Sequence, residues 1–228
     1  MTETVILVHG YFRSFRDMHF LENYLNKRGY KAISPIFPTT LGSLEECSVN
    51  LSNYIDTLNL SIGDTLHLVG HSMGGLIIRR CLASRIIAGL GRCVLIATPN
   101  AGTLLADLAS RFLRHSPMNP FKSIRSLKTS AEKIRGPLNS PCPEIGVISG
   151  NSSDFSLGLV LRSQNDGRVE VESTKIDAMK DFIVLPYGHH EIHHREETAK
   201  MIDVFLRTGN FKLDLGAGHS DLLLYGER

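Results

Sequence analysis

One stretch, residues 65–78, restricts the folds open to this chain more than any other. It reads TLHLVGHSMGGLII, so that an apolar run stops at Gly70, a serine follows at Ser72, and a second apolar run begins after Gly74. Small residues two positions before and after a serine are what a sharp strand-to-helix turn requires, because the backbone passes close to itself there. The pattern predicts a buried strand, a strained turn that lifts the Ser72 hydroxyl above a sheet, and a helix.

Five further apolar segments are typical of strands, and amphipathic helical patterns separate several of them. The expected strands cover residues 5–8, 30–37, 92–98, 144–150 and 182–186, and the expected helices cover residues 14–28, 43–58 and 191–206. Strands that alternate with helices indicate right-handed crossovers and a parallel sheet. We therefore expect one α/β domain over residues 1–228, with a mostly parallel sheet of about six strands flanked by helices on both faces.

Two serines are placed to begin helices. Ser14 stands three residues before Asp17, and Ser43 stands three residues before Glu46. This is the spacing of a capping box, in which the serine hydroxyl accepts a hydrogen bond from the backbone three residues later. The sequence therefore predicts that both serines cap their helices.

Polar residues gather where the predicted strands end. Residues 9–11 (His-Gly-Tyr) follow the first strand, Ser72 follows the strand of the central stretch, and residues 98–100 (Thr-Pro-Asn) follow the next one. The carboxyl ends of parallel strands lie at one edge of the sheet, which is where such folds bind ligands. We expect a single functional site at that edge, and we interpret the His9 side chain as structural.

A serine hydroxyl becomes an effective nucleophile when a histidine removes its proton and a carboxylate orients that histidine. In folds with this strand-to-helix turn the order along the chain is serine, acid, histidine. Asp166 and His189 follow Ser72 in that order, and His189 stands directly after the last predicted strand. Asp154 is the alternative acid and His190 is the alternative base.

The histidine-rich segment also contains a second motif. Residues 190–194 (HEIHH) match H-E-x-x-H, in which two histidines one helical turn apart bind zinc and the glutamate acts as a base. His189 and His193 are four residues apart as well, and so repeat that spacing. A zinc metallopeptidase is therefore an alternative function, but a third ligand is not evident and the motif leaves the Ser72 turn unexplained. We expect neither a metal nor a cofactor.

The composition is that of an ordinary globular protein. The chain has 42% hydrophobic and 21% charged residues and a formal net charge of +2, which is too small to indicate a nucleic-acid partner. It shows no secretory signal and no apolar run of about 20 residues, the length of a transmembrane helix. Cys47, Cys81 and Cys93 lie in apolar patterns and suit a reducing compartment, so we expect a cytoplasmic protein.

Two segments are harder to interpret. Residues 102–143 contain apolar stripes interrupted by Pro117 and Pro120, and we expect either a small cap or pocket wall over the site, or ordinary packing helices. The tail, residues 209–228, gives no pattern on which to base a prediction.

Four motifs together resemble the α/β-hydrolase superfamily, and within it the small lipases and esterases. They are residues 9–11 (HGY), 70–74 (GHSMG), 166–169 (DGRV) and 185–189 (LPYGH). The resemblance implies Ser72 as nucleophile, Asp166 as acid, His189 as base, and the backbones of Tyr11 and Met73 as oxyanion donors. The sequence departs from the family pattern at His190, where another residue type is usual, so His190 stays open beside His189.

The function we expect is hydrolysis of carboxylic esters through an acyl-serine intermediate, as in lipid metabolism. The substrate would be a small acyl ester or a lipid, with transient contact with a membrane surface in the lipid case. Esterase, lipase, thioesterase, acyltransferase and amidase chemistry all use the same three groups, so the sequence leaves them open. A binding protein without catalysis on the same scaffold is a further alternative. The oligomeric state is open.

Overall fold

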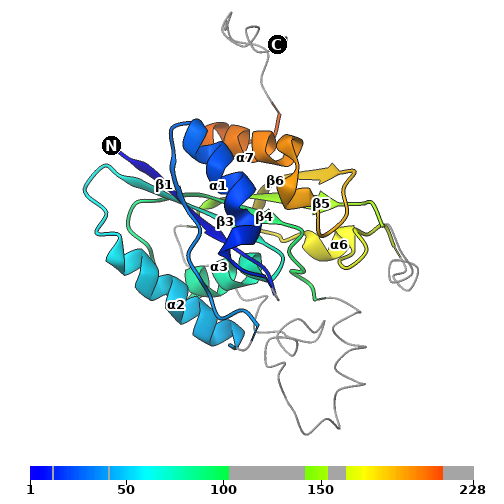
Figure 1. Ribbon diagram of the computed structural model, residues 1–228, viewed down its shortest axis with the longest axis horizontal. Coiled ribbons are helices and arrows are strands. Elements are labelled where there is room, and N and C mark those ends of the chain that lie inside the picture. The colour runs from blue at the N-terminus through cyan, green and yellow to red at the C-terminus, as the bar shows by residue number, and fades with distance from the viewer. Residues whose placement is uncertain (12, 41, 103–141, 154–162, 213–228) are drawn as a thin grey trace, which may run out of the picture.

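Six parallel strands form the sheet in this computed structural model (Figure 1), which describes residues 1–11, 13–40, 42–102, 142–153 and 163–212. Their order is β2-β1-β3-β4-β5-β6. The strands are β1 (Glu3–Val8), β2 (Lys31–Ile33), β3 (Thr65–His71), β4 (Leu90–Ile96), β5 (Glu144–Gly150) and β6 (Met179–Leu185). The prediction of an α/β fold with a parallel sheet of this size is therefore confirmed.

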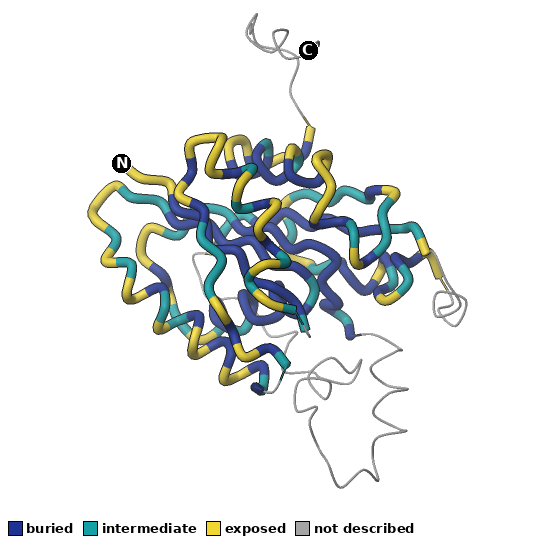
Figure 2. Tube along the Cα trace, in the orientation of Figure 1, coloured by how far each residue is buried: buried dark blue, intermediate teal, exposed yellow. Residues whose placement is uncertain are grey.

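Helices cover both faces of the sheet, as expected. The helices α1 (His19–Lys27) and α7 (Glu196–Thr208) lie over one face, and α2 (Leu44–Thr57) and α3 (Met73–Ser84) lie over the other. Val5 and Leu7 pack towards α1 and α7, whereas Ile6 and Val8 pack towards α2 and α3, and all are fully buried. A strand covered on both faces needs a continuous apolar run, which explains the sequence of β1 (Figure 2).

The strand order changes direction between β1 and β3. The chain leaves β1 to one side to form β2 and returns on the other side as β3. Loops at the carboxyl ends of β1 and β3 consequently diverge, which leaves room for a ligand at that point of an open α/β sheet. Ser72 follows β3 directly at this position.

One of the two predicted capping boxes is present. The Ser43 hydroxyl accepts from Glu46 N at 3.1 Å, and a Glu46 carboxylate oxygen accepts from Ser43 N at 2.7 Å. The prediction for Ser14 is wrong, because its side chain makes no capping hydrogen bond. The chain first forms a 3-10 turn, η1 (Phe15–Met18), and the Asp17 carboxylate is paired with His193 instead of a helix terminus.

Two predicted elements differ in extent. The second strand is limited to β2, because Pro35 beyond its end has no N–H to donate to a neighbouring strand. The last predicted helix is divided into a 3-10 turn, η5 (Ile192–His194), and α7, with Arg195 extended between them at ψ 137°. His193 and His194 therefore lie outside α7, and residues 190–194 do not form the single helix that the zinc motif requires.

A short helix, α6 (Val171–Thr174), follows the loop that carries Asp166 and was not predicted. Among the described residues no helix is long and apolar enough to cross a bilayer. Residues 103–141, which make up nearly all of the expected cap, and residues 213–228 of the tail lie outside the described part of the chain.

Candidate active site

Ser72 occupies a strained turn between β3 and α3. Its backbone has φ 54° and ψ −122°, a conformation that costs a residue with a side chain about 1–3 kcal/mol. Hydrogen bonds hold the turn, since Ser72 N donates to Ile96 O at 2.8 Å and Gly75 N donates to Ser72 O at 3.1 Å. The turn places the hydroxyl against the loop after β6, where it contacts His189.

The glycines on either side of Ser72 are required by close packing. A Cβ on Gly70 would lie 2.6 Å from the backbone of Gly74 and of Gly75. A Cβ on Gly74 would lie 2.0 Å from the carbonyl oxygen of Val8. Any side chain at these positions would push α3 away from β1 and β3, so the G-x-S-x-G spacing follows from how closely the three elements approach.

The structure brings Asp166 and His189 together with Ser72. His189 Nε2 lies 3.0 Å from Ser72 Oγ, and His189 Nδ1 lies 2.7 Å from Asp166 Oδ2. In the tautomer with the proton on Nδ1, the ring donates to the carboxylate and accepts from the hydroxyl. His189 is 6% exposed and Asp166 is 3% exposed, so both are screened from water, while Ser72 is half-buried.

The Asp-Gly-Arg-Val turn fixes the carboxylate. Asp166 Oδ1 accepts from Arg168 N at 3.0 Å and from Val169 N at 2.8 Å. Gly167 has φ 91°, which a residue with a side chain rarely adopts. The Asp166 carbonyl also accepts from His189 N at 2.9 Å. One turn thus orients the acid and holds the backbone of the histidine. The alternative acid, Asp154, lies outside the described residues.

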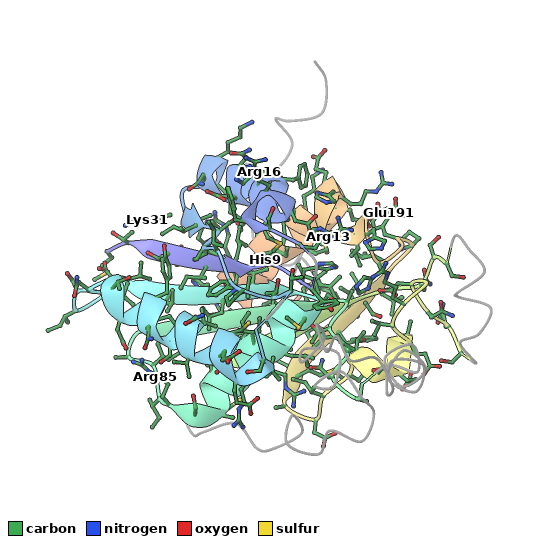
Figure 3. The ribbon with its side chains drawn as sticks, turned by 60° about the horizontal axis from the view of Figure 1, so that its bottom comes forward. His9, Arg13, Arg16, Lys31, Arg85 and Glu191 are labelled. Atoms are coloured by element: carbon green, nitrogen blue, oxygen red, sulfur yellow. The ribbon has the colours of Figure 1, made fainter. Side chains whose placement is uncertain are left out.

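His190 has different neighbours from His189. Its Nδ1 accepts a hydrogen bond from Arg13, which lies in the loop after β1. That loop and the loop carrying Glu191 lie side by side (Figure 3). Burial, with the nearby charge of Arg168, lowers the pKa of His190 to about 4. The structure therefore places His189, and not His190, against the Ser72 hydroxyl.

The two predicted oxyanion donors belong to segments that adjoin the nucleophile. Met73 is the first residue of α3, whose N-terminal N–H groups and dipole favour negative charge. The exit of β1 passes close by, because a Cβ on Gly10 would lie 3.1 Å from Ser72 Cβ, and Tyr11 follows Gly10. His9 accepts from Phe37 N at 3.3 Å through Nε2, which is a contact within the fold.

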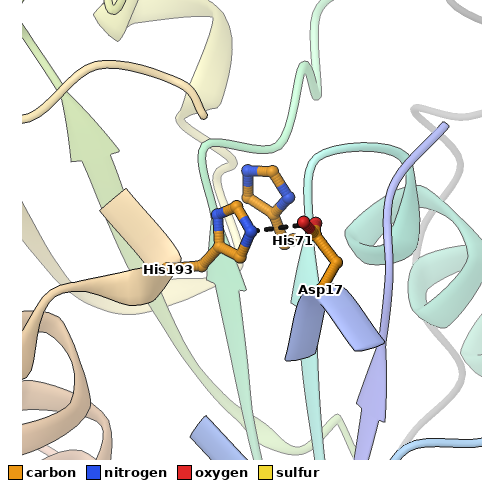
Figure 4. Close-up of side chains that lie close together, drawn as sticks. All are labelled: Asp17, His71 and His193. Atoms are coloured by element: carbon orange, nitrogen blue, oxygen red, sulfur yellow. Dashed lines mark hydrogen bonds and ion pairs between the residues drawn. The ribbon is translucent and has the colours of Figure 1, made fainter. Parts of the chain in front are cut away.

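A second cluster, formed by the half-buried Asp17 and the buried His71 and His193, lies beside these residues (Figure 4). His193 Nε2 lies 2.9 Å from Asp17 Oδ2, and the rings of His71 and His193 stack with centroids 3.8 Å apart. His71 Nε2 donates to the carbonyl of His189 at 3.0 Å. Sequence reasoning missed this cluster, since its members come from three distant segments and each was assigned to a different local motif: Asp17 to a capping box, His71 to the turn around Ser72, and His193 to the histidine-rich segment.

The fold and the strained serine at the end of a central strand define an α/β hydrolase. The family model described as "Alpha/beta hydrolase family" matches residues 5–147, and the chain belongs to this family. Asp166 and His189 lie beyond the matched residues, so their placement comes from the structure. A comparison with curated proteins gives no match.

Solved structures of lipases and esterases share this fold. The mature lipase of Bacillus licheniformis is 18% identical over 90% of both chains, with a TM-score of 0.73. A metagenomic carboxyl esterase is 17% identical over 83% of this chain and 65% of its own, with a TM-score of 0.67. Est1E from Butyrivibrio proteoclasticus, solved with ferulic acid, is 13% identical over 90% and 88%, with a TM-score of 0.61. At identities this low, the structural likeness shows a common fold alone.

Proposed function

We propose that this protein is a serine hydrolase that cleaves carboxylic esters through an acyl-Ser72 intermediate. The observation that carries the proposal is the hydrogen-bonded line from Ser72 through His189 to Asp166. This is the arrangement that nucleophilic catalysis by serine requires: nucleophile and base in contact, and the base oriented by a buried acid. The lipase and esterase structures with the same fold are consistent with it.

In the first half of the reaction Ser72 Oγ attacks the acyl carbonyl while its proton passes to His189 Nε2. Asp166 remains ionised and stabilises the imidazolium by the hydrogen bond to Nδ1. When the tetrahedral intermediate collapses, the bond to the alcohol oxygen breaks. His189 Nε2 returns the proton to that oxygen, so that the alcohol leaves and the acyl group stays on Ser72.

The carbonyl oxygen carries negative charge in the tetrahedral intermediate. We propose that the backbone N–H groups of Met73 and Tyr11 donate to this oxygen, because one stands at the α3 N-terminus and the other in the β1 loop beside Ser72. Fixed donors of this kind are worth about 10²–10³ in rate each in enzymes of this type.

In the second half a water molecule takes the place of the alcohol. His189 removes its proton as it attacks the acyl carbonyl, and the same proton returns to Ser72 Oγ as the ester bond to the serine breaks. The carboxylic acid is released and the starting state is restored. The overall reaction is ester plus water to acid plus alcohol.

We propose a small-molecule acyl ester or lipid as substrate, with transient contact with a membrane surface if lipids are used, and a cytoplasmic location. The cysteines of the described residues are all free, and Cys47, Cys81 and Cys93 are buried, which suits a reducing compartment.

The test is hydrolysis of p-nitrophenyl esters of increasing acyl length by the wild type and by Ser72→Ala. We expect turnover by the wild type, labelling of Ser72 by a serine-directed fluorophosphonate, and loss of both in the variant, whose far-UV circular dichroism should be unchanged. Preference for long chains at an interface would indicate a lipase, and preference for short chains an esterase. Activity that persists in Ser72→Ala would refute the proposal.

A further inference from the structure

The cluster of Asp17, His71 and His193 collects metal-ligating side chains from three separate segments. Asp17 belongs to the turn η1, His71 is the last residue of β3, and His193 belongs to η5 (Figure 4). One potential ligand atom from each lies within 4.8 Å of the others. His71 is 2% exposed and His193 is fully buried, whereas Asp17 is half-buried, so the two imidazoles meet the carboxylate just below the surface.

His71 is oriented as a metal ligand would be. Its Nε2–H donates to the His189 carbonyl at 3.0 Å, which leaves the lone pair on Nδ1 as the ligating position. Metal-binding histidines are usually fixed in this way, by a hydrogen bond from the other ring nitrogen to a carbonyl or carboxylate. His71 Nδ1 is buried and has no hydrogen-bond partner among the described residues.

His193 completes the donor set with Asp17. Its Nε2 lies 2.9 Å from the Asp17 carboxylate, and its Nδ1 is buried without a partner within the described chain. A carboxylate oxygen and one nitrogen from each of two imidazoles are thus gathered at one point, and these are groups that ligate divalent metal ions.

We propose that Asp17, His71 and His193 bind one divalent transition metal ion, with zinc as the expected occupant. Two imidazoles and one carboxylate suit zinc, whereas magnesium and calcium prefer oxygen ligands alone. The ligand atoms of a tetrahedral zinc site are about 3.3 Å apart. Because the three ligand atoms here lie within 4.8 Å of one another, the most distant two would have to move about 1.5 Å closer at most when zinc binds. A water molecule takes the fourth position.

Metal binding at this site releases no proton, so it needs no proton acceptor outside the site. The proton that His193 shares with Asp17 at Nε2 moves to Nδ1 of the same ring, and Nε2 and Asp17 then face the ion. Among the described residues His193 Nδ1 has no partner in either state, whereas His71 Nδ1 gains the ion as its partner. The ion would join η1, β3 and η5, and through His71 it would position Ser72 and the His189 backbone.

The experiment measures metal binding directly, so its outcome does not depend on ester hydrolysis. Protein stripped with EDTA is dialysed free of chelator and titrated with Zn²⁺ against a chromophoric chelator, and separately with Co²⁺. We expect one zinc per chain, the visible bands of tetrahedral cobalt, and a higher Tm with Zn²⁺ than with Mg²⁺. His71→Ala and His193→Ala should weaken zinc binding roughly a hundredfold or more.

Two further variants keep the test decisive. The double variant His190→Ala/His194→Ala removes both histidines of the H-E-x-x-H motif and should retain the zinc and the cobalt spectrum. Asp17→Asn keeps the size of the side chain, so the variant should fold. Its zinc binding should nevertheless be much weaker, because the charged ligand is lost. No stoichiometric binding by the wild type, binding that survives in His193→Ala and Asp17→Asn, or binding lost only in the double variant would overturn the proposal.

Discussion

Two histidine–carboxylate pairs lie side by side in this protein and differ in what surrounds them. The distance from ring nitrogen to carboxylate oxygen is 2.7 Å in the His189–Asp166 pair and 2.9 Å in the His193–Asp17 pair. In the first pair the other ring nitrogen faces the Ser72 hydroxyl. In the second the other ring nitrogen is buried without a partner among the described residues.

The carboxylates differ as well. The second oxygen of Asp166 is held by two backbone N–H groups, whereas that of Asp17 lies 3.5 Å from the cations Arg13 and, when protonated, His194. The comparison shows that a histidine–aspartate pair is not in itself a catalytic device. The group placed at the remaining ring nitrogen decides whether the pair can transfer a proton to a substrate.

The largest expected difference between the pairs concerns the histidines. His189→Ala should lower kcat roughly 10⁵-fold, because no base remains for Ser72. His193→Ala, measured in the presence of EDTA, should keep kcat within about tenfold, because the ring does not contact the hydroxyl. Steady-state kinetics on a p-nitrophenyl ester tests both variants. Equal losses would show that the two pairs act as one catalytic unit.

A smaller contrast is expected for the carboxylates. Asp166→Asn should lower kcat about 10³–10⁴-fold by favouring the wrong tautomer of His189. Asp17→Asn should leave kcat within about tenfold but lower the free energy of unfolding by about 1–3 kcal/mol, because a buried charged hydrogen bond is lost. Urea denaturation and kinetics measured on both proteins separate the effects. A stability loss confined to Asp166→Asn would contradict the distinction.

His71 connects the two pairs, and its removal should show an intermediate effect. His71→Ala leaves the His189 carbonyl without its donor and opens a cavity, so we expect about 2–3 kcal/mol lower stability. The loosened loop should also reduce kcat roughly tenfold. His71→Gln can still donate from its amide nitrogen and should recover most of the activity. If the glutamine variant behaves like the alanine variant, the hydrogen bond to His189 is not what matters.

The smallest effect is expected at His190. Because its pKa is lowered to about 4, this ring is neutral in the folded protein above about pH 5 and changes no charge between pH 5 and 8. His190→Gln should therefore leave the acid limb of the kcat/KM profile unchanged. A shift of that limb would instead identify His190 as a group that titrates during catalysis.

Most of the fold was predictable because its determinants are local. Continuous apolar runs identified the strands, and the Ser43–Glu46 spacing identified a helix start that the structure contains. Predictions failed where a distant partner intervened. Asp17 fits the pattern of a helix cap, but in the structure it pairs with His193. The histidine motif fits a helix, but only residues 192–194 form a 3-10 turn, which ends before the extended Arg195.

The candidate site shows the same division. The G-x-S-x-G spacing identified Ser72, because α3 approaches β1 and β3 so closely that only glycine fits at positions 70 and 74. Asp166 and His189 could be proposed from their order after Ser72, but His190 and Asp154 remained open because sequence order does not say which ring turns towards the hydroxyl. The pairing of His71 with His193 gave no local signal at all.

By itself the sequence determined the strained serine, the parallel sheet and the edge at which the loops meet, because apolar periodicity and glycine spacing act between near neighbours in the chain. Only the tertiary structure decided which histidine faces Ser72 and which aspartate holds each ring. Those choices depend on side chains that are more than a hundred residues apart for the Ser72–His189 and Asp17–His193 contacts. The geometry of these contacts is set by how distant segments pack across the sheet, and a pattern within a short stretch of sequence cannot predict that packing.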